Sequence, residues 1–148
     1  MATSILVAFS DSVSTRVMMD YLMAMPLCRE ECQVTLLHVF MKPSASEELM
    51  GKKFTEEQPA RLLAALQRAK DKLVEIGFSP DNVQVELVSD PYATVADGII
   101  DQCKKRGCQM VMIGRKKMSK AEEFVMGDVC VKLVRAVEGV AVLVVKSR

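Results

Sequence analysis

The stretch Met110-Val-Met-Ile-Gly114-Arg-Lys-Lys-Met-Ser-Lys-Ala-Glu-Glu-Phe-Val-Met-Gly127-Asp128-Val129-Cys130 decides the fold of this chain. It opens with a short apolar run, continues through a polar segment between two glycines, and leads into apolar residues at helical spacing. A strand, a glycine-flanked loop and a helix in this order hold phosphates in parallel α/β folds. Glycines let the backbone approach the ligand, and the helix N-terminus offers free N–H groups and a partial positive charge. The stretch therefore predicts an α/β domain with a candidate phosphate-binding loop.

Outside this stretch, short apolar runs alternate with segments whose apolar residues recur at helical spacing. The expected strands are residues 5–9, 32–40, 83–88, 109–113 and 140–145. The expected helices are residues 12–25, 59–76, 91–107 and 128–138, with Pro59 in the first turn of the second and Asp90 starting the third. Strands separated by helices of this length predict right-handed crossovers and a parallel sheet. We expect residues 1–148 to form one three-layer, doubly wound domain with a five-stranded parallel sheet.

Such a sheet binds ligands beyond the carboxyl ends of its strands, at the point where the strand order reverses. Two places in the chain fit this description. One is the end of the first expected strand, from Phe9 to Ser12, and the other is the end of the fourth, at Gly114.

The composition limits the classes of partner. The net charge is +1 at pH 7, so no overall field attracts nucleic acid or an acidic membrane. Aromatic residues make up 5% and tryptophan is absent, so surfaces for base stacking are poorly supplied. The N-terminus lacks the basic and apolar segments of a signal peptide, and no apolar run approaches the ~20 residues of a membrane span. We expect a cytoplasmic protein that binds neither nucleic acid nor membrane.

The five cysteines are Cys28, Cys32, Cys103, Cys108 and Cys130. The spacing of the first two matches neither a zinc ribbon nor a redox Cys-x-x-Cys pair. We expect buried or half-buried free thiols, with redox or metal roles as the alternative. The single histidine, His38, lies inside an expected strand, which favours a structural role over that of a general base. Because no nucleophile, base and orienting group converge, no enzyme is expected, and weak ATPase activity is the remaining alternative.

Four segments in the same order resemble the universal stress protein family across essentially the whole chain. They are Ile5-Leu-Val-Ala-Phe-Ser-Asp-Ser12, Leu36-Leu-His-Val39, Met110-Val-Met-Ile-Gly114, and Gly127-Asp-Val-Cys130 with Leu133-Val-Arg-Ala and Val142-Leu-Val-Val145. The corresponding family patterns are ILVAVDGS, LLHV, LIVMG and GSVS…VLRHA…PVLVV. The resemblance implies a Rossmann-like fold of the adenine nucleotide alpha hydrolase-like type, with a five-stranded parallel sheet, and usually a homodimer.

One branch of that family binds ATP through Gly-x-x-Gly, nine further residues, and then Gly-Ser/Thr. The resemblance implies a degenerate version of this site in the present chain. Its candidate residues are Ser10, Val39, Gly114, Lys117, Gly127, Asp128, Val129 and Cys130. Gly114 and Gly127 keep the outer glycine positions, and Val39 would offer its backbone to adenine.

The other positions depart from the family pattern. Lys117 replaces the second glycine and restricts the positive φ that would turn N–H groups toward phosphate. Asp128 replaces the Ser/Thr and puts a carboxylate where the phosphate would lie, although it is a good helix cap. Cys130 replaces the next hydroxyl, and Ser10 replaces the acid that would hold the ribose.

These changes favour a dimeric stress-response or regulatory module with an unknown protein partner and weak or absent ATP binding. The alternative is an ATP- or nucleotide-binding switch that acts through the Gly114–Gly127 loop, where several cations could partly restore positive potential. The dimer is expected through the last strand, Val140–Val145, because a continuously apolar strand at a sheet edge invites pairing with a second copy.

Overall fold

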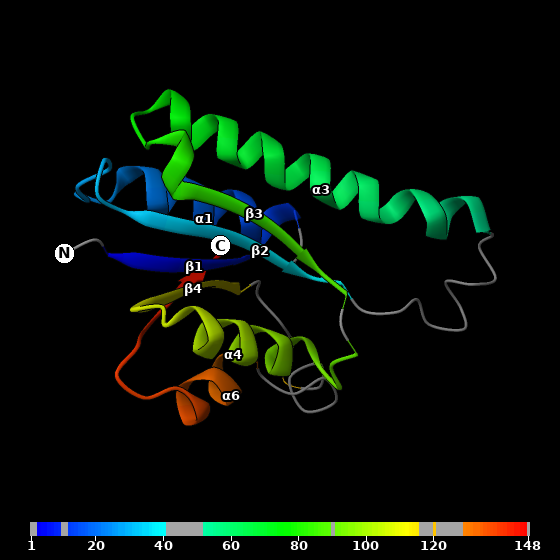
Figure 1. The fold of residues 1–148 in the computed structure, drawn as a ribbon. Coiled ribbons are helices and arrows are strands. Elements are labelled where there is room, and N and C mark those ends of the chain that lie inside the picture. The colour runs from blue at the N-terminus through cyan, green and yellow to red at the C-terminus, as the bar shows by residue number, and fades with distance from the viewer. Residues whose placement is uncertain are drawn as a thin grey trace.

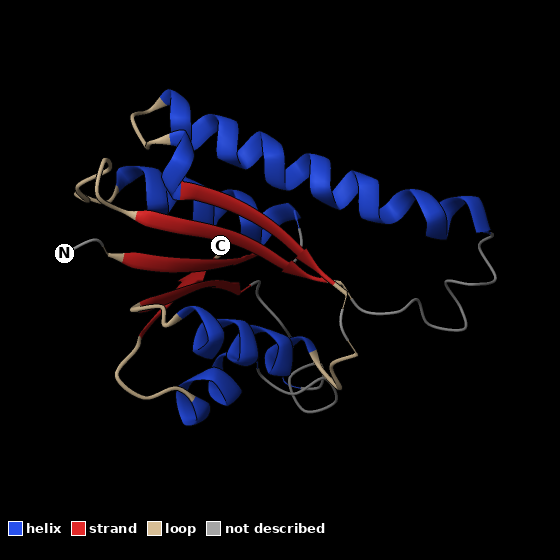
Figure 2. Ribbon diagram, in the orientation of Figure 1, coloured by secondary structure: helices blue, strands red, loops and turns tan. Residues whose placement is uncertain are grey.

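A computed structural model of the chain describes residues 3–9, 12–40, 52–89, 91–115, 120 and 129–147. Within these residues five strands form one parallel sheet, in the order β3-β2-β1-β4-β5 (Figures 1 and 2). The strands are β1 (Ser4–Phe9), β2 (Gln33–Val39), β3 (Val83–Val88), β4 (Met110–Arg115) and β5 (Ala141–Lys146). The helices are α1 (Ser12–Ala24), α3 (Lys52–Glu75), α4 (Val95–Arg106) and α6 (Val129–Ala136), with a short 3-10 turn η1 (Pro80–Asn82). The expected doubly wound α/β fold is confirmed.

The central strand β1 owes its place to apolar residues on both of its faces. Its residues from Ile5 to Phe9 are all buried, as expected for a parallel strand covered by helices on both sides. It pairs in register with β2, where Ile5 lies opposite Val34, and with β4, where Ile5 lies opposite Met110. The strand that begins the chain thus forms the middle of the sheet.

The helices divide between the two faces of the sheet (Figure 1). α1 and α3 cover one face, where Met18, Leu22, Leu66 and Leu73 are buried against the sheet. α4 and α6 cover the other face, with Ile99 and Leu133 in a second buried cluster. After β3, at one edge of the sheet, the chain moves to the other face, where α4 leads back to β4 beside β1. The chain then continues from β4 through α6 to β5 at the opposite edge. The strand order therefore reverses between β1 and β4.

The second long helix begins earlier than its sequence predicts. α3 starts at Lys52, so Pro59 lies inside the helix rather than in its first turn. A proline in a helix interior removes one N–H donor and crowds the preceding turn. The prediction gave that local preference too much weight, because good helix formers precede the proline and the apolar residues that follow it anchor the helix to the sheet. The predicted end of this helix near residue 76 is confirmed: Gly77 has φ +117°, and Phe78 N–H donates to Leu73 O at 3.0 Å.

α4 starts later than predicted. Its cap is Thr94, whose Oγ1 accepts a hydrogen bond from Asp97 N–H at 3.1 Å, so the helix begins at Val95 and not at residue 91, and Asp90 lies outside the described residues. At its other end the expected Gly107 adopts φ 60° and donates its N–H to the carbonyls of Cys103 and Lys104. Capping by a threonine side chain supplies the acceptor that the first turn needs.

The prediction of free thiols is wrong for two of the cysteines. Cys103 and Cys108 form a disulfide, which joins the last turn of α4 to the residues before β4. The left-handed turn at Gly107 reverses the chain and brings the two side chains together, which spacing alone does not reveal. Cys32 and Cys130 are buried thiols outside any disulfide, whereas Cys28 is an exposed thiol rather than a buried one.

Candidate functional site

The reversal of strand order places the candidate site between the carboxyl ends of β1 and β4. The two strands are neighbours there, with Ala8 opposite Ile113. The carboxyl ends of these two strands are therefore close in space, as the position of a ligand site in an open α/β sheet requires. Four of the candidate residues, Ser10, Lys117, Gly127 and Asp128, lie outside the described residues.

Gly114 belongs to β4 rather than to the loop after it. It pairs with Val145 of β5, and the ladder continues through Arg115 opposite Lys146 to Ser147, whose N–H donates to Arg115 O at 2.9 Å. Its φ is not positive, unlike that of Gly77, Gly107 and Gly139. The predicted strand, residues 109–113, ended too early. Pairing with β5 is a long-range contact that cannot be predicted from a glycine at the end of a strand. The candidate loop therefore begins after Arg115.

Val39 ends β2 at the same edge of the sheet. It is buried, and Phe40 N–H donates to Val88 O at 2.7 Å just after it. Its side chain packs against α4 at Gly98, where a Cβ would lie only 2.8 Å from Val39 Cγ1 and 3.0 Å from Tyr92 Cδ2. The absence of a side chain at Gly98 thus allows α4 to approach the end of β2, and it fixes the wall beside Val39.

The two candidate residues on α6 have different surroundings. Val129 is the first residue of the helix and is half-buried. Cys130 is buried in the apolar cluster beneath α4 and α6, which also contains Leu133. The side chain at the hydroxyl position of the family pattern therefore contributes to the core.

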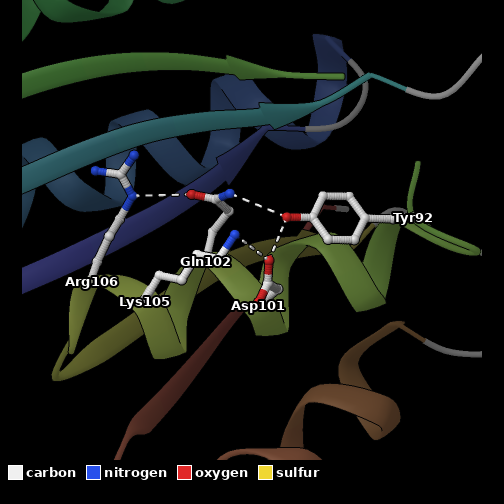
Figure 3. Close-up of polar contacts among 5 residues, drawn as sticks. All are labelled: Tyr92, Asp101, Gln102, Lys105 and Arg106. Carbon is white, nitrogen blue, oxygen red and sulfur yellow. Dashed lines mark hydrogen bonds and ion pairs between the residues drawn. The ribbon is translucent and has the colours of Figure 1, made fainter. Parts of the chain in front are cut away.

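A polar network along α4, which the sequence did not reveal, joins Tyr92, Asp101, Gln102, Lys105 and Arg106 (Figure 3). Tyr92 Oη donates to Asp101 Oδ2 at 2.6 Å, and Gln102 Nε2 donates to Tyr92 Oη at 3.3 Å. The hydrogen bond between Tyr92 and Asp101 raises the pKa of Tyr92 and lowers the pKa of Asp101. The tyrosine hydroxyl is thereby held as a donor to a charged carboxylate.

The same network reaches the edge strand β3. Arg106 Nε donates to Gln102 Oε1 at 3.4 Å, and its terminal nitrogens contact Gln84 Oε1 at 3.3 Å and Glu86 Oε1 at 3.2 Å. Asp101 also pairs with Lys105 at 3.0 Å. The i, i+4 spacing of Asp101 and Lys105 and of Gln102 and Arg106 was a readable signal, but Tyr92 joins only through the fold.

His38 lies on the face of β2 opposite the side chain of Val39, so it does not face this wall. Burial lowers the pKa of its imidazole, and a hydrogen bond with the Phe9 backbone opposes that shift in part. A half-buried neutral histidine between strands agrees with the structural role that the sequence favoured.

Among the described residues, the His, Cys, Asp and Glu side chains form no group of three that could hold a metal ion. None of the described helices is long and apolar enough to cross a membrane. The geometry supplies a sheet edge where the strand order reverses, beside the close packing of Val39 on α4 at Gly98.

Sequence comparison gives one family. A family model described as Usp, the universal stress protein family, matches residues 1–146. No curated protein matches the chain.

Solved structures share the fold at low sequence identity. The hypothetical protein MJ0577 is 21% identical with a TM-score of 0.68, over 100% of this chain and 98% of the other. A universal stress protein in complex with cAMP is 13% identical with a TM-score of 0.67, over 99% and 98% of the two chains. The universal stress protein from Archaeoglobus fulgidus in complex with dAMP is 14% identical with a TM-score of 0.52, over 99% and 98%.

Proposed function

This chain belongs to the universal stress protein family, and from that premise we propose that it is a cytoplasmic, non-catalytic stress-response module that binds ATP weakly or not at all. The observation that carries the proposal is the chemistry around the start of α6. Asp128 directly precedes the helix, and Cys130 is buried in the core instead of offering a hydroxyl. A carboxylate at a helix N-terminus caps the free N–H groups and repels a phosphate from the same position.

Two more departures act in the same direction. Lys117 replaces a glycine that would let backbone N–H groups turn toward phosphate. Ser10 lacks the charge with which a carboxylate would strengthen hydrogen bonds to ribose. Gly114 is part of the ladder with β5, so the backbone freedom needed for phosphate has to come from the residues after Arg115.

Calorimetry with Mg-ATP tests the proposal. The dissociation constant should exceed ~100 μM, which corresponds to less than about 5.5 kcal/mol of binding free energy. A micromolar constant, or ATP that co-purifies with the chain, contradicts it.

A restored site gives a sharper test. The double variant Asp128→Ser with Lys117→Gly removes a repulsive charge and returns a flexible backbone position. It should gain about 1–3 kcal/mol of ATP affinity, the size of hydrogen bonds to charged groups. Asp81→Ser is the matched control, since it removes the same charge at η1, before the amino end of β3. If the double variant binds no better than the parent, Ser10 becomes the residue to restore.

The second candidate is a nucleotide-binding switch acting through the residues between Gly114 and Gly127. It is favoured by the two relatives in complex with cAMP and dAMP. A ligand with a single phosphate depends less on the positions changed at Lys117 and Asp128. Calorimetry with AMP and cAMP beside Mg-ATP distinguishes the two, because micromolar binding of a monophosphate alone supports the switch.

We also propose that two copies pair through β5. In the described residues β5 is an edge strand that pairs with β4 only, and its Val144 is 39% exposed. Val131 and Val134 of α6, the helix that precedes β5, are also exposed. Antiparallel pairing of two copies about a two-fold axis would satisfy both edges at once.

A further inference from the structure

The disulfide between Cys103 and Cys108 lies in the wall of an open pocket at the amino-terminal ends of β4 and β5. The pocket has a volume of about 600 Å³. Its walls are two turns, one from α4 to β4 and the other from α6 to β5. It is therefore at the opposite end of these strands from the candidate nucleotide site.

The two turns leave the mouth of the pocket open. Gly107 and Gly139 each line it and each adopt positive φ, and a Cβ at either position would have no atom within 4 Å. The walls are held together by backbone pairing, since Ala141 N–H donates to Gln109 O at 2.9 Å. Cys103 and Cys108 are 2% and 5% exposed and belong to the buried cluster beneath α4, and the pocket is the open space that both residues line.

The pocket also carries one charge of each sign. Lys104 comes from the end of α4, and Glu138 comes from the turn after α6, and both are exposed. A ligand with a carboxylate and an ammonium group complements this pair. We propose that the pocket is a thiol–disulfide exchange site for a small peptide thiol that bears both groups.

The exchange proceeds in two balanced steps. The thiolate of the peptide attacks Cys103 Sγ, the bond between the two protein sulfur atoms breaks, and its electron pair leaves on Cys108 Sγ, which takes up a proton. A second peptide thiolate attacks the peptide sulfur of this mixed disulfide and releases Cys103, which is protonated in turn. The protein disulfide is reduced to two thiols, and two peptide thiols are oxidised to one disulfide.

Cys103 is the sulfur attacked first because of its place on the helix. It lies in the C-terminal turn of α4, where the helix dipole disfavours negative charge, so the leaving thiolate forms at Cys108. The turn itself does not depend on the bond between the sulfur atoms. Gly107 N–H donates to Lys104 O and Cys108 N–H donates to Cys103 O, both at 3.3 Å, so the turn can stay folded in both redox states.

Counting thiols in redox buffers of reduced and oxidised glutathione tests the exchange. The folded chain is equilibrated, alkylated under native conditions, then denatured, and its labels are counted by intact mass. Of the five cysteines, two form the disulfide, so reduction should add two labels. Cys103→Ser and Cys108→Ser should each abolish that paired gain, and Cys108→Ser should accumulate one glutathione adduct at Cys103.

Cys28→Ser is the matched control, because it removes an exposed thiol and should leave the gain of two labels unchanged. Two results would overturn the proposal. One is a pair that never oxidises in any of the buffers. The other is a disulfide that glutathione reduces only after denaturation.

Rates test recognition by the pocket. Lys104→Gln should slow reduction by glutathione by about threefold, the effect of losing one exposed ion pair. It should leave reduction by mercaptoethanol, which carries no charge, unchanged. Lys105→Gln is the control, since this neighbouring cation pairs with Asp101 and does not line the pocket. Equal slowing with both thiols, or in both variants, contradicts the proposed ligand chemistry.

Discussion

Replacing Gly98 by alanine should push α4 away from the end of β2. The new Cβ would lie 2.8 Å from Val39 Cγ1 and 3.0 Å from Val39 Cγ2 and Tyr92 Cδ2. Neither neighbour moves easily, because valine is stiff at χ1 and the Tyr92 ring is held by its hydrogen bond to Asp101. Overpacking of this kind costs about 1–3 kcal/mol. Alanine regains about 1 kcal/mol of helix propensity, so the net loss should be about 0–2 kcal/mol.

A double-mutant cycle separates the cost of overpacking from the gain in helix propensity. The free energy of unfolding is measured in urea for the parent, Gly98→Ala, Val39→Ala and the double variant. When Val39 is shortened, its two contacts with the new Cβ are removed and only the 3.0 Å contact with Tyr92 Cδ2 remains. The effect of Gly98→Ala should then shift toward the gain of about 1 kcal/mol that helix propensity gives. The coupling energy should then reach about 1–3 kcal/mol. If Gly98→Ala has the same effect in both backgrounds, the close approach of α4 to Val39 does not limit packing, and this reasoning is refuted.

Three further predictions follow from other contacts. Arg29→Ala should lower the free energy of unfolding in urea by about 1.5–3 kcal/mol, because its guanidinium donates to Ile76 O at 2.6 Å and to Met23 O at 3.1 Å; Arg29→Lys should recover only part. Burial lowers the pKa of His38 from its ordinary 6.5, so the unfolded chain binds more protons and stability should fall as the pH decreases below 6.5. His38→Gln should flatten that dependence in thermal melts from pH 5 to 8. Light scattering at ~50 μM should show a dimer, and Val144→Lys should shift it toward monomer. Leu63→Lys, at an exposed position on α3, should leave the dimer unchanged. A monomeric parent rules out the β5 interface.

Features set by neighbouring residues could be predicted from the sequence, and those set by distant contacts could not. The sequence predicts helix ends near residues 76 and 107, because a glycine that can adopt the left-handed conformation follows each helix locally. It predicts the end of a strand before Gly114, whereas the pairing of Gly114 with Val145 depends on a strand that follows much later. Tyr92 joins Asp101 and Gln102 only once α4 has packed on the sheet.

The candidate site shows the same division. The structure confirms the alternation of strands and helices from which its position between β1 and β4 is inferred. The burial of Cys130 does not follow from the family pattern, because that pattern assigns a residue type to a position and not a direction to its side chain. The bond between Cys103 and Cys108 was missed for a related reason, since only the turn at Gly107 brings them together.

Oxidation of Cys103 and Cys108 should stabilise the domain without moving α4. The bond spans a sequence separation of 5, for which loss of chain entropy in the unfolded state gives about 2 kcal/mol. The position of α4 is already fixed elsewhere, by the contact of Gly98 with Val39 and by the ion pair of Arg106 with Glu86 at 3.2 Å. The midpoint of urea unfolding should therefore rise on oxidation, while changes in native hydrogen exchange stay within residues 103–109. Altered exchange at the first turn of α4, beside Thr94, would show instead that the disulfide controls the whole helix and, through it, the wall beside Val39.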